Sequence, residues 1–322
     1  MTFLQLQQRL ARRRGANDTS IPTATATRYK EAINETHRTL LRTPGMESLR
    51  HAIETFATVA STAKYALPTQ GIARIDRIWE TTNRRKLDYK TLDWLRESDP
   101  SPQTGTPWAW VPTGYSEVAT QPSDASAIYA KSSSASDTSQ TIYIEGIITG
   151  GYYRTASNTL NGTTAVNLSS TISTFEQVTK CYLSATAVGT VSLYEDSGSG
   201  TELARITIGK TRAQYVEFIL YPTPAAAVTY YVDATRGVPD MSNDTDEPLI
   251  PEDFHDLLLD GAELRELKKQ DDKSRWTLVS DNFERGKRDL KTWITNHPDY
   301  APVFGRQQAG FSTLGAFFPR GT

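Results

Sequence analysis

Two kinds of hydrophobic periodicity divide this chain of 322 residues, and their order limits the folds that it can adopt. Near both ends, apolar residues recur every three or four positions, as they do along one face of an amphipathic helix. In the middle, apolar and polar residues alternate in short runs bounded by Gly, Asn, Pro and Ser, as in strands joined by turns. This order predicts a multidomain α+β protein in which helices at both ends flank a β-rich centre.

The first hundred residues predict several helices and a few strands. Apolar spacing indicates helices over residues 4–14, 25–41, 46–60 and 88–96, and alternating runs indicate strands over residues 64–67, 72–79 and 108–111. The third helical pattern is the strongest, because its apolar residues from Met46 to Ala60 follow one another at intervals of three and four.

The centre of the chain predicts a β-sandwich. Residues 119–140 are rich in Ser, Asp and Ala and read as a linker with one apolar patch at Ile128-Tyr129. Short alternating runs and turn residues such as Asn161-Gly162 then continue to residue 208. Short strands at regular intervals are typical of a sandwich of two antiparallel sheets.

The last hundred residues return from strands to helices. Two strands are expected over residues 215–221 and 228–232, followed by two helices that begin near Pro251 and end near Pro298. The strands before residue 119 should pair with those after 213, which would bring the flanking helices together. We therefore expect a helical core with a small β-sheet, interrupted by the sandwich. The predicted parts are 1–118 and 214–300 for this core, 119–213 for the insert, and 301–322 for a C-terminal arm.

Charge is unevenly distributed along the chain. Residues 1–96 carry 17 basic and 9 acidic side chains, whereas residues 97–240 carry 7 and 13, and residues 241–322 carry 11 and 15. Such segregation favours either head-to-tail contacts between copies or a basic face near nucleic acid. The basic runs are Arg12-Arg13-Arg14 and Arg84-Arg85-Lys86, and neither has the interleaved aromatic residues of a single-strand binder.

The sequence contains no catalytic motif that stands above background. Nucleophile-elbow, P-loop, dinucleotide-binding and zinc-protease patterns are absent, and the four histidines are scattered. The single cysteine, Cys181, excludes an internal disulfide framework. No apolar run reaches the ~18 residues of a membrane span, and the first residues do not resemble a secretory signal. We expect a soluble protein that is not an enzyme and uses no cofactor or metal.

Three groups of motifs carry a resemblance to a known family. The first group is Lys64-Tyr65-Ala66-Leu67-Pro68, residues 72–79, residues 87–95 and Gly105-Thr106-Pro107-Trp108-Ala109-Trp110. The second is residues 218–224, Tyr230-Tyr231-Val232, Glu247-Pro248-Leu249-Ile250-Pro251 and Gly261-Ala262. Together they are similar to the two halves of head-to-tail adaptor (connector, or neck) proteins of tailed bacteriophages. The third, Leu160-Asn161-Gly162-Thr163-Thr164 with residues 203–206, resembles an Ig-like module that some neck proteins carry.

The resemblance implies a structural protein of the virion, assembled in the host cytoplasm. Such proteins form a ring, usually of twelve copies, between the portal protein and a tail tube or nozzle protein, and DNA passes through the ring without sequence-specific contacts during genome ejection. The two basic runs could face this channel, and the insert could contact tail fibres. We hypothesise that the C-terminal arm binds the portal through Phe304, Phe311, Phe317 and Phe318.

Two alternatives remain open from the sequence. The arm could instead pack on the chain's own helices. The whole chain could be a β-sandwich carbohydrate-binding or tail-fibre-attachment protein, with Tyr152-Tyr153 and Tyr194 as the visible aromatic candidates.

Overall fold

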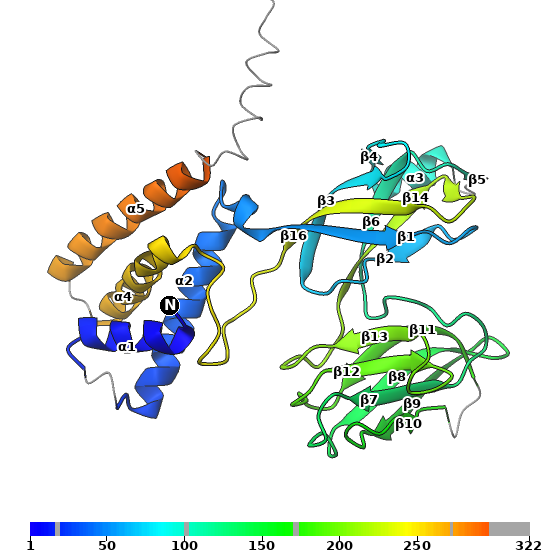
Figure 1. The fold of residues 1–322 in the computed structure, drawn as a ribbon, viewed down its shortest axis with the longest axis horizontal. Helices are drawn as coiled ribbons and strands as arrows, with labels where there is room; N and C mark the ends of the chain where they lie inside the picture. The colour runs from blue at the N-terminus through cyan, green and yellow to red at the C-terminus, as the bar shows by residue number, and fades with distance from the viewer. Residues whose placement is uncertain (17–19, 100–102, 170–173, 271–272, 296–322) are drawn as a thin grey trace, which may run out of the picture. The chain divides into compact units, whose positions relative to one another are not determined.

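The computed structural model describes residues 1–16, 20–99, 103–169, 174–270 and 273–295 (Figure 1). Contacts divide the chain into two compact units, one formed by Met1–His51 with Val238–Thr322 and the other by Ala52–Gly237. We call them the helical unit and the β unit. The predicted mixture of helices with several antiparallel sheets is confirmed.

Four helices from the two ends of the chain form the helical unit. They are α1 (Phe3–Arg13), α2 (Thr23–Arg42), α4 (His255–Gln270) and α5 (Lys273–Thr295), with single 3-10 turns η1 (Glu47–Arg50) and η2 (Glu252–Phe254). Helix α1 begins at a capping box in which the Thr2 hydroxyl accepts from the Gln5 N–H and the Gln5 side chain accepts from the Thr2 N–H. All four helices contribute buried side chains to one core, including Leu6, Leu258 and Leu290. The prediction that the flanking helices come together is confirmed.

One region predicted as a helix forms a strand instead, and a second, residues 88–96, is a helix only after a short strand at Asp88–Tyr89. Residues 46–60 form η1 and then β1 (His51–Ala57), in which Ala52 and Phe56 are buried while Ile53 is 64% exposed. Ile53 and Phe56, which are three residues apart, would share one face of the predicted helix but lie on opposite faces of the strand, so the helix predicted here is wrong. Residues 88–96 divide at Thr91, whose side chain caps the start of α3 (Leu92–Ser98).

Strands from before and after the centre of the chain pair to form the first part of the β unit. One sheet has the order β1-β16-β3, where β16 is Thr229–Arg236 and β3 is Ile72–Glu80. A second has the order β2-β14-β6-β4, formed by Lys64–Ala66, Tyr215–Tyr221, Ala109–Ser116 and Asp88–Tyr89. Strands β5 (Thr104–Gly105) and β15 (Thr223–Pro224) form a short parallel pair. The expected pairing of strands across the centre is therefore confirmed.

One core joins the two larger sheets of this part. Phe56 of β1 stacks on Tyr230 of β16, with ring centroids 5.4 Å apart, and meets Phe218 of β14 edge-on at 5.1 Å. Because these rings come from both sheets, their packing ties the segment before residue 119 to the segment after 213.

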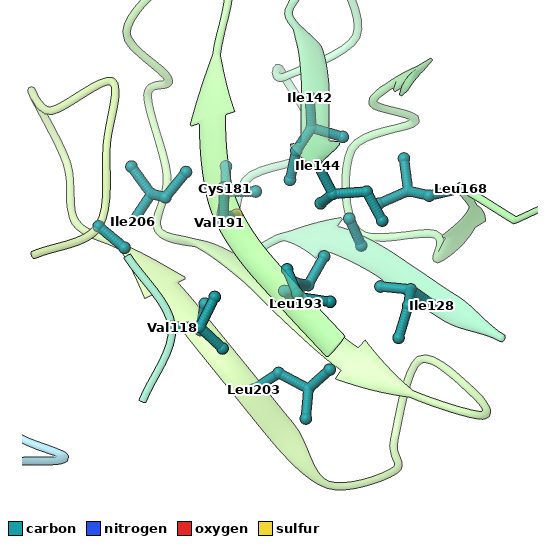
Figure 2. Close-up of a cluster of buried hydrophobic side chains, with 14 of the residues drawn as sticks. Val118, Ile128, Ile142, Ile144, Leu168, Cys181, Val191, Leu193, Leu203 and Ile206 are labelled. Atoms are coloured by element: carbon teal, nitrogen blue, oxygen red, sulfur yellow. The ribbon is translucent and has the colours of Figure 1, made fainter. Parts of the chain in front are cut away.

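Residues 118–213, which we call the two-sheet region, form the second part of the β unit. Its strands are β7 (Ile128–Ser132), β8 (Thr141–Ile148), β9 (Tyr152–Thr159), β10 (Val166–Asn167), β11 (Phe175–Leu183), β12 (Val191–Glu195) and β13 (Glu202–Ile206). They pair in the orders β10-β7-β12-β13 and β11-β8-β9, all antiparallel. Side chains from both sheets, such as Ile144 and Leu193, share one apolar cluster (Figure 2).

The linker predicted over residues 119–140 is wrong in its central part, because β7 lies between β10 and β12. Asp137 is fully buried there, and its carboxylate accepts hydrogen bonds from Ser132 Oγ and from the backbone N–H groups of Val188 and Gly189. Burial raises the pKa of Asp137, but these hydrogen bonds lower it more, so that the net shift is downward. The Ser- and Asp-rich composition thus serves internal hydrogen bonds that a composition argument does not anticipate.

The chain leaves the first part of the β unit at the end of β6 and returns at the start of β14. These two ends are adjacent, because Tyr215 pairs with Ser116. Replacing residues 118–213 by an Asn-Gly turn, together with Tyr215→Thr to remove a ring that would lose its cover, should leave the rest of the chain folded. A cooperative thermal transition followed by circular dichroism checks this. A chain without such a transition would show that the two-sheet region is required for folding.

Candidate functional site

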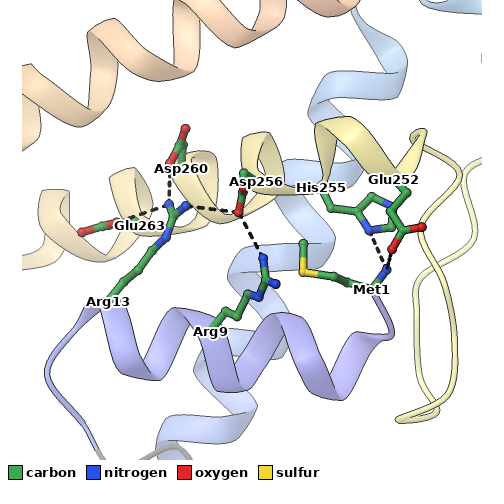
Figure 3. Close-up of polar contacts among 8 residues, drawn as sticks. All are labelled: Met1, Arg9, Arg13, Glu252, His255, Asp256, Asp260 and Glu263. Atoms are coloured by element: carbon green, nitrogen blue, oxygen red, sulfur yellow. Dashed lines mark hydrogen bonds and ion pairs between the residues drawn. The ribbon is translucent and has the colours of Figure 1, made fainter.

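Charged side chains join α1 to one face of α4 (Figure 3). Arg13 forms ion pairs with Asp260, with Asp256 at 3.3 Å and with Glu263 at 3.8 Å, while Arg9 lies 3.6 Å from Asp256. The three acidic residues are spaced four and three apart, so they lie along one side of the helix. Burial raises the pKa of Asp260, and the nearby Arg13 opposes that shift.

Two buried carboxylates extend this network to the other helices. The Glu263 side chain is 4% exposed and lies 2.6 Å from Arg275 of α5, and Glu266 is 2% exposed and lies 2.7 Å from Arg28 of α2. A shallow groove of about 630 Å³ runs beside Arg13, Glu263 and Arg275. Because the acidic groups of the groove are paired with arginines, we interpret it as a structural contact between α1, α4 and α5 rather than as a ligand site.

Arg13 should matter more to stability than its neighbour Arg9. Arg13→Ala is expected to lower the free energy of unfolding by about 1–2 kcal/mol, because partly buried Asp260 loses its cation. Arg9→Ala is the matched control, since both Arg9 and Asp256 are more than half exposed, and should cost less than about 0.5 kcal/mol. Urea unfolding of both variants measures the difference. Equal costs would contradict the assignment of Arg13 as the main contact.

Two buried histidines hold the segment that leads into α4. His37 Nε2 accepts from the backbone N–H of Leu249 at 3.2 Å, while its Nδ1 has no hydrogen-bond partner among the described residues. His255 Nε2 lies 2.9 Å from the carbonyl oxygen of Ile250. Burial lowers the pKa of both imidazoles, that of His37 to about 4. Both rings are therefore neutral at pH 7.

The basic residues that were predicted to face a DNA channel belong to two different units, Arg12, Arg13 and Arg14 to the helical unit and Arg84 and Arg85 to the β unit. Arg13 is committed to the ion pairs with α4, and Arg12 and Arg14 lie beside it at the end of α1. Arg85 donates to the carbonyl oxygen of Pro107 and lies 3.5 Å from buried Glu80. Arg84 occupies an exposed turn at a φ of 50°. Their proposed contact with DNA stays a prediction.

Strand pairing creates a surface that no single run of sequence contains. In the sheet β1-β16-β3, Tyr231 lies opposite Trp79, and a further bridge places Lys86 opposite Trp79 on its other side. Ile78 is fully buried, so Arg77 and Trp79, its neighbours on β3, lie on the outer face. We call Arg77, Trp79, Lys86 and Tyr231 the basic-aromatic face. Sequence reasoning missed it, because its members are brought together only by register.

The tyrosines considered for carbohydrate binding do not form one site. Tyr152 and Tyr153 lie on β9, and Tyr194 lies on β12 of the other sheet. The Tyr153 hydroxyl donates to the Glu145 carboxylate at 2.9 Å, and Lys131 lies 4.9 Å from the ring centre of Tyr194. Of these three tyrosines, Tyr152 and Tyr153 present large aromatic surfaces, since they are 65% and 51% exposed.

The phenylalanines predicted to bind the portal belong to the C-terminal arm. Phe304, Phe311, Phe317 and Phe318 lie outside the described residues.

Within the ranges that the structure describes, no cluster of three or more His, Cys, Asp or Glu side chains could hold a metal ion. Among the helices so described, none is long and apolar enough to cross a membrane. Cys181 is buried, which raises the pKa of its thiol to about 12.

A protein-family model described as SU10 adaptor protein matches residues 1–161. The matched segment runs from α1 to β9 and therefore includes parts of both compact units. No curated protein matches the chain.

Proposed function

Because the chain belongs to the SU10 adaptor protein family, whose members are bacteriophage structural adaptors, we propose that it forms a ring between the portal and the tail. The observation that carries this proposal is the family match to half of the chain, including helices α1 and α2 and the strands from β1 to β6. The ring would continue the DNA channel without sequence-specific contacts. The ring would contain about twelve copies of the chain, and its neighbours would be the portal protein and a tail tube or nozzle protein.

The fold supports extending the adaptor assignment beyond the matched residues. Strands β3 and β6 lie within residues 1–161, but each completes its sheet with a strand from after residue 213, namely β16 and β14. Helices α1 and α2 likewise share their core with α4 and α5. The segment after 213 is therefore part of the same folded units that the matched segment begins.

The two-sheet region is the part for which we propose an accessory role. We propose that it is an Ig-like β-sandwich inserted into the adaptor and carried on the outside of the ring, where tail fibres could attach. The adjacent ends of β6 and β14 support an insertion at this point. An extra domain at such a site disturbs neighbouring contacts least.

Mixing the purified chain with the portal ring of the same phage tests the proposal. Mass photometry should show mass added to the portal in steps that approach one chain for each portal subunit. A chain that leaves the mass of the portal ring unchanged would contradict the adaptor function. Deleting residues 301–322 then tests the arm separately, since the deletion should abolish portal attachment and preserve the fold.

One observation favours carbohydrate binding as a second candidate function of the two-sheet region. Tyr152 and Tyr153 expose large aromatic surfaces next to Arg154 on β9. Aromatic rings of this kind can stack on sugar rings, although exposed tyrosines are also common in sheets. A glycan screen with the full chain and with a Tyr152→Ser, Tyr153→Ser variant distinguishes sugar binding from ordinary exposure of tyrosines. Binding that the variant loses would support the second function.

A further inference from the structure

The basic-aromatic face has two cations that form no ion pair within the described part of the chain. Neither Arg77 nor Lys86 forms an ion pair with any carboxylate that the structure places, although both are exposed. By contrast, Arg74 on the same strand lies 2.6 Å from Asp76. Apolar surface accompanies these cations, since Tyr231 is 49% exposed and Ile53 on β1 is 64% exposed. An exposed face that combines free cations with apolar side chains is typical of an interface.

A segment of the helical unit has the complementary character. Residues 240–263 contain nine Asp and Glu residues and neither Lys nor Arg. Several of them are paired within the unit, as Asp240 is with Arg38 and Asp244 with Lys30. Among the described residues, no cation is paired with Glu247 or Asp253 in this way.

Glu247 and Asp253 are both exposed, and neither forms an ion pair among the residues that the structure places. Between them, Leu249 is 38% exposed. We call residues 247–253 the acidic segment. It offers two free carboxylates around an apolar side chain, whereas the basic-aromatic face offers two free cations around aromatic side chains.

We propose that the basic-aromatic face of one copy binds the acidic segment of a second copy. This inference rests on the proposed function, because it names the contact between neighbours in the adaptor ring. The two surfaces belong to different units of one chain, so every copy carries both halves of the contact. Such a head-to-tail interface continues from copy to copy and closes into a ring when the rotation between neighbours allows it.

The chemistry of the face favours a protein partner over nucleic acid. Ile53 is 64% exposed, and an aliphatic side chain gains nothing from a phosphate contact. A partner that brings a leucine together with separated carboxylates can contact both the cations and this apolar side chain.

Charge reversal of each half provides a direct test. The variants are Arg77→Glu with Lys86→Glu, and Glu247→Lys with Asp253→Lys, each in the full chain. Each variant alone should associate with its own copies at least ~10-fold more weakly, because like charges would then face each other. An equimolar mixture should recover association, since the reversed face of one variant matches the reversed segment of the other. Arg154→Glu with Lys210→Glu, two exposed cations of the two-sheet region, is the matched control and should behave as the unmodified chain does.

Sedimentation velocity of the free chains and mass photometry of the chains on the portal ring give the readout. Circular dichroism shows first that each variant is folded. Unchanged association in either reversed variant, or no recovery in the mixture, would overturn the inference. If the Arg77→Glu, Lys86→Glu variant instead keeps its self-association and loses binding to a 30-base-pair DNA duplex that the unmodified chain binds, the face is assigned to nucleic acid. If each reversed variant still binds the portal ring but only as isolated copies, the adaptor function remains supported. If the unmodified chain does not bind the portal ring, the adaptor function is rejected.

Discussion

Acidification from pH 6.5 to pH 4 is expected to lower the free energy of unfolding of the helical unit by about 3 kcal/mol through His37 alone. Burial lowers the pKa of His37 from 6.5 to about 4 in the folded protein, with Asp240 opposing the shift and His255 adding to it. Between these values the unfolded chain binds a proton that the folded chain does not, and each pKa unit corresponds to about 1.4 kcal/mol. The stabilisation is thus complete above pH 6.5 and is lost as the pH falls toward 4.

Burial is the main cause of this shift, and the hydrogen bond of the ring acts in the same direction. His37 Nε2 accepts from the Leu249 N–H, and a protonated ring would place a second donor there. Urea unfolding followed at 222 nm across pH 4–7 measures the slope. His37→Gln retains an acceptor without a titrating group and should flatten the profile, except for the smaller part that His255 contributes. Identical pH profiles of the two chains would contradict this role of His37.

Gly146→Ala is expected to cost the two-sheet region about 3 kcal/mol or more. Gly146 lies on β8 opposite Val178 of β11, and a Cβ there would lie 2.0 Å from the carbonyl oxygen of Gln177. A backbone oxygen cannot move aside as the end of a side chain can, so the two strands would have to separate.

Gly105→Ala is the matched control for that substitution. A Cβ at Gly105 would lie 3.5 Å from the ring of Pro222, which is ordinary van der Waals contact. The control should change stability by less than about 1 kcal/mol, near the usual effect of a surface substitution. Hydrogen exchange of residues 141–183 locates the loss, and equal protection in both variants would show that β8 and β11 tolerate the added methyl group.

The sequence predicted the order of elements well, because strong periodicities and clear turns mark most of them. The stripe from Trp276 to Trp293 lies within the single helix α5, and the run over 215–221 forms strand β14. Prediction failed in β1, because the spacing of Met46, Leu49, Ile53 and Phe56 fits a helix, whereas the strand buries Phe56 and exposes Ile53. Such cases are decided by pairing with a distant strand, here β16, which local spacing does not reveal.

Composition was less informative than periodicity. The Ser- and Asp-rich stretch around β7 reads as a linker, yet Asp137 is buried because Ser132 and two backbone N–H groups satisfy its carboxylate. The same limit applies to the candidate surfaces. Arg13 was predicted from a run of arginines as a contact for DNA, and the fold pairs it with three acidic residues of α4 that are distant in sequence.

The basic-aromatic face shows why surfaces are harder to predict than elements. Lys86 was noted in a basic run without aromatic neighbours, and Tyr231 lies 145 positions further along the chain. Only the bridge between Lys86 and Trp79 and the register of β16 with β3 bring these side chains to one face. Periodicity can indicate which residues of a strand face outward, but the partner strand must be known before they form a surface.

The most direct test of the structural adaptor function is the phenotype of the virus that encodes this chain when the chain is missing. A stop codon introduced after the segment for α1, in a host with and without a suppressor, allows particles to be compared by electron microscopy. The account predicts capsids without attached tails in the nonsuppressing host and complete particles in the suppressing host. Complete, infectious particles in both hosts would contradict it.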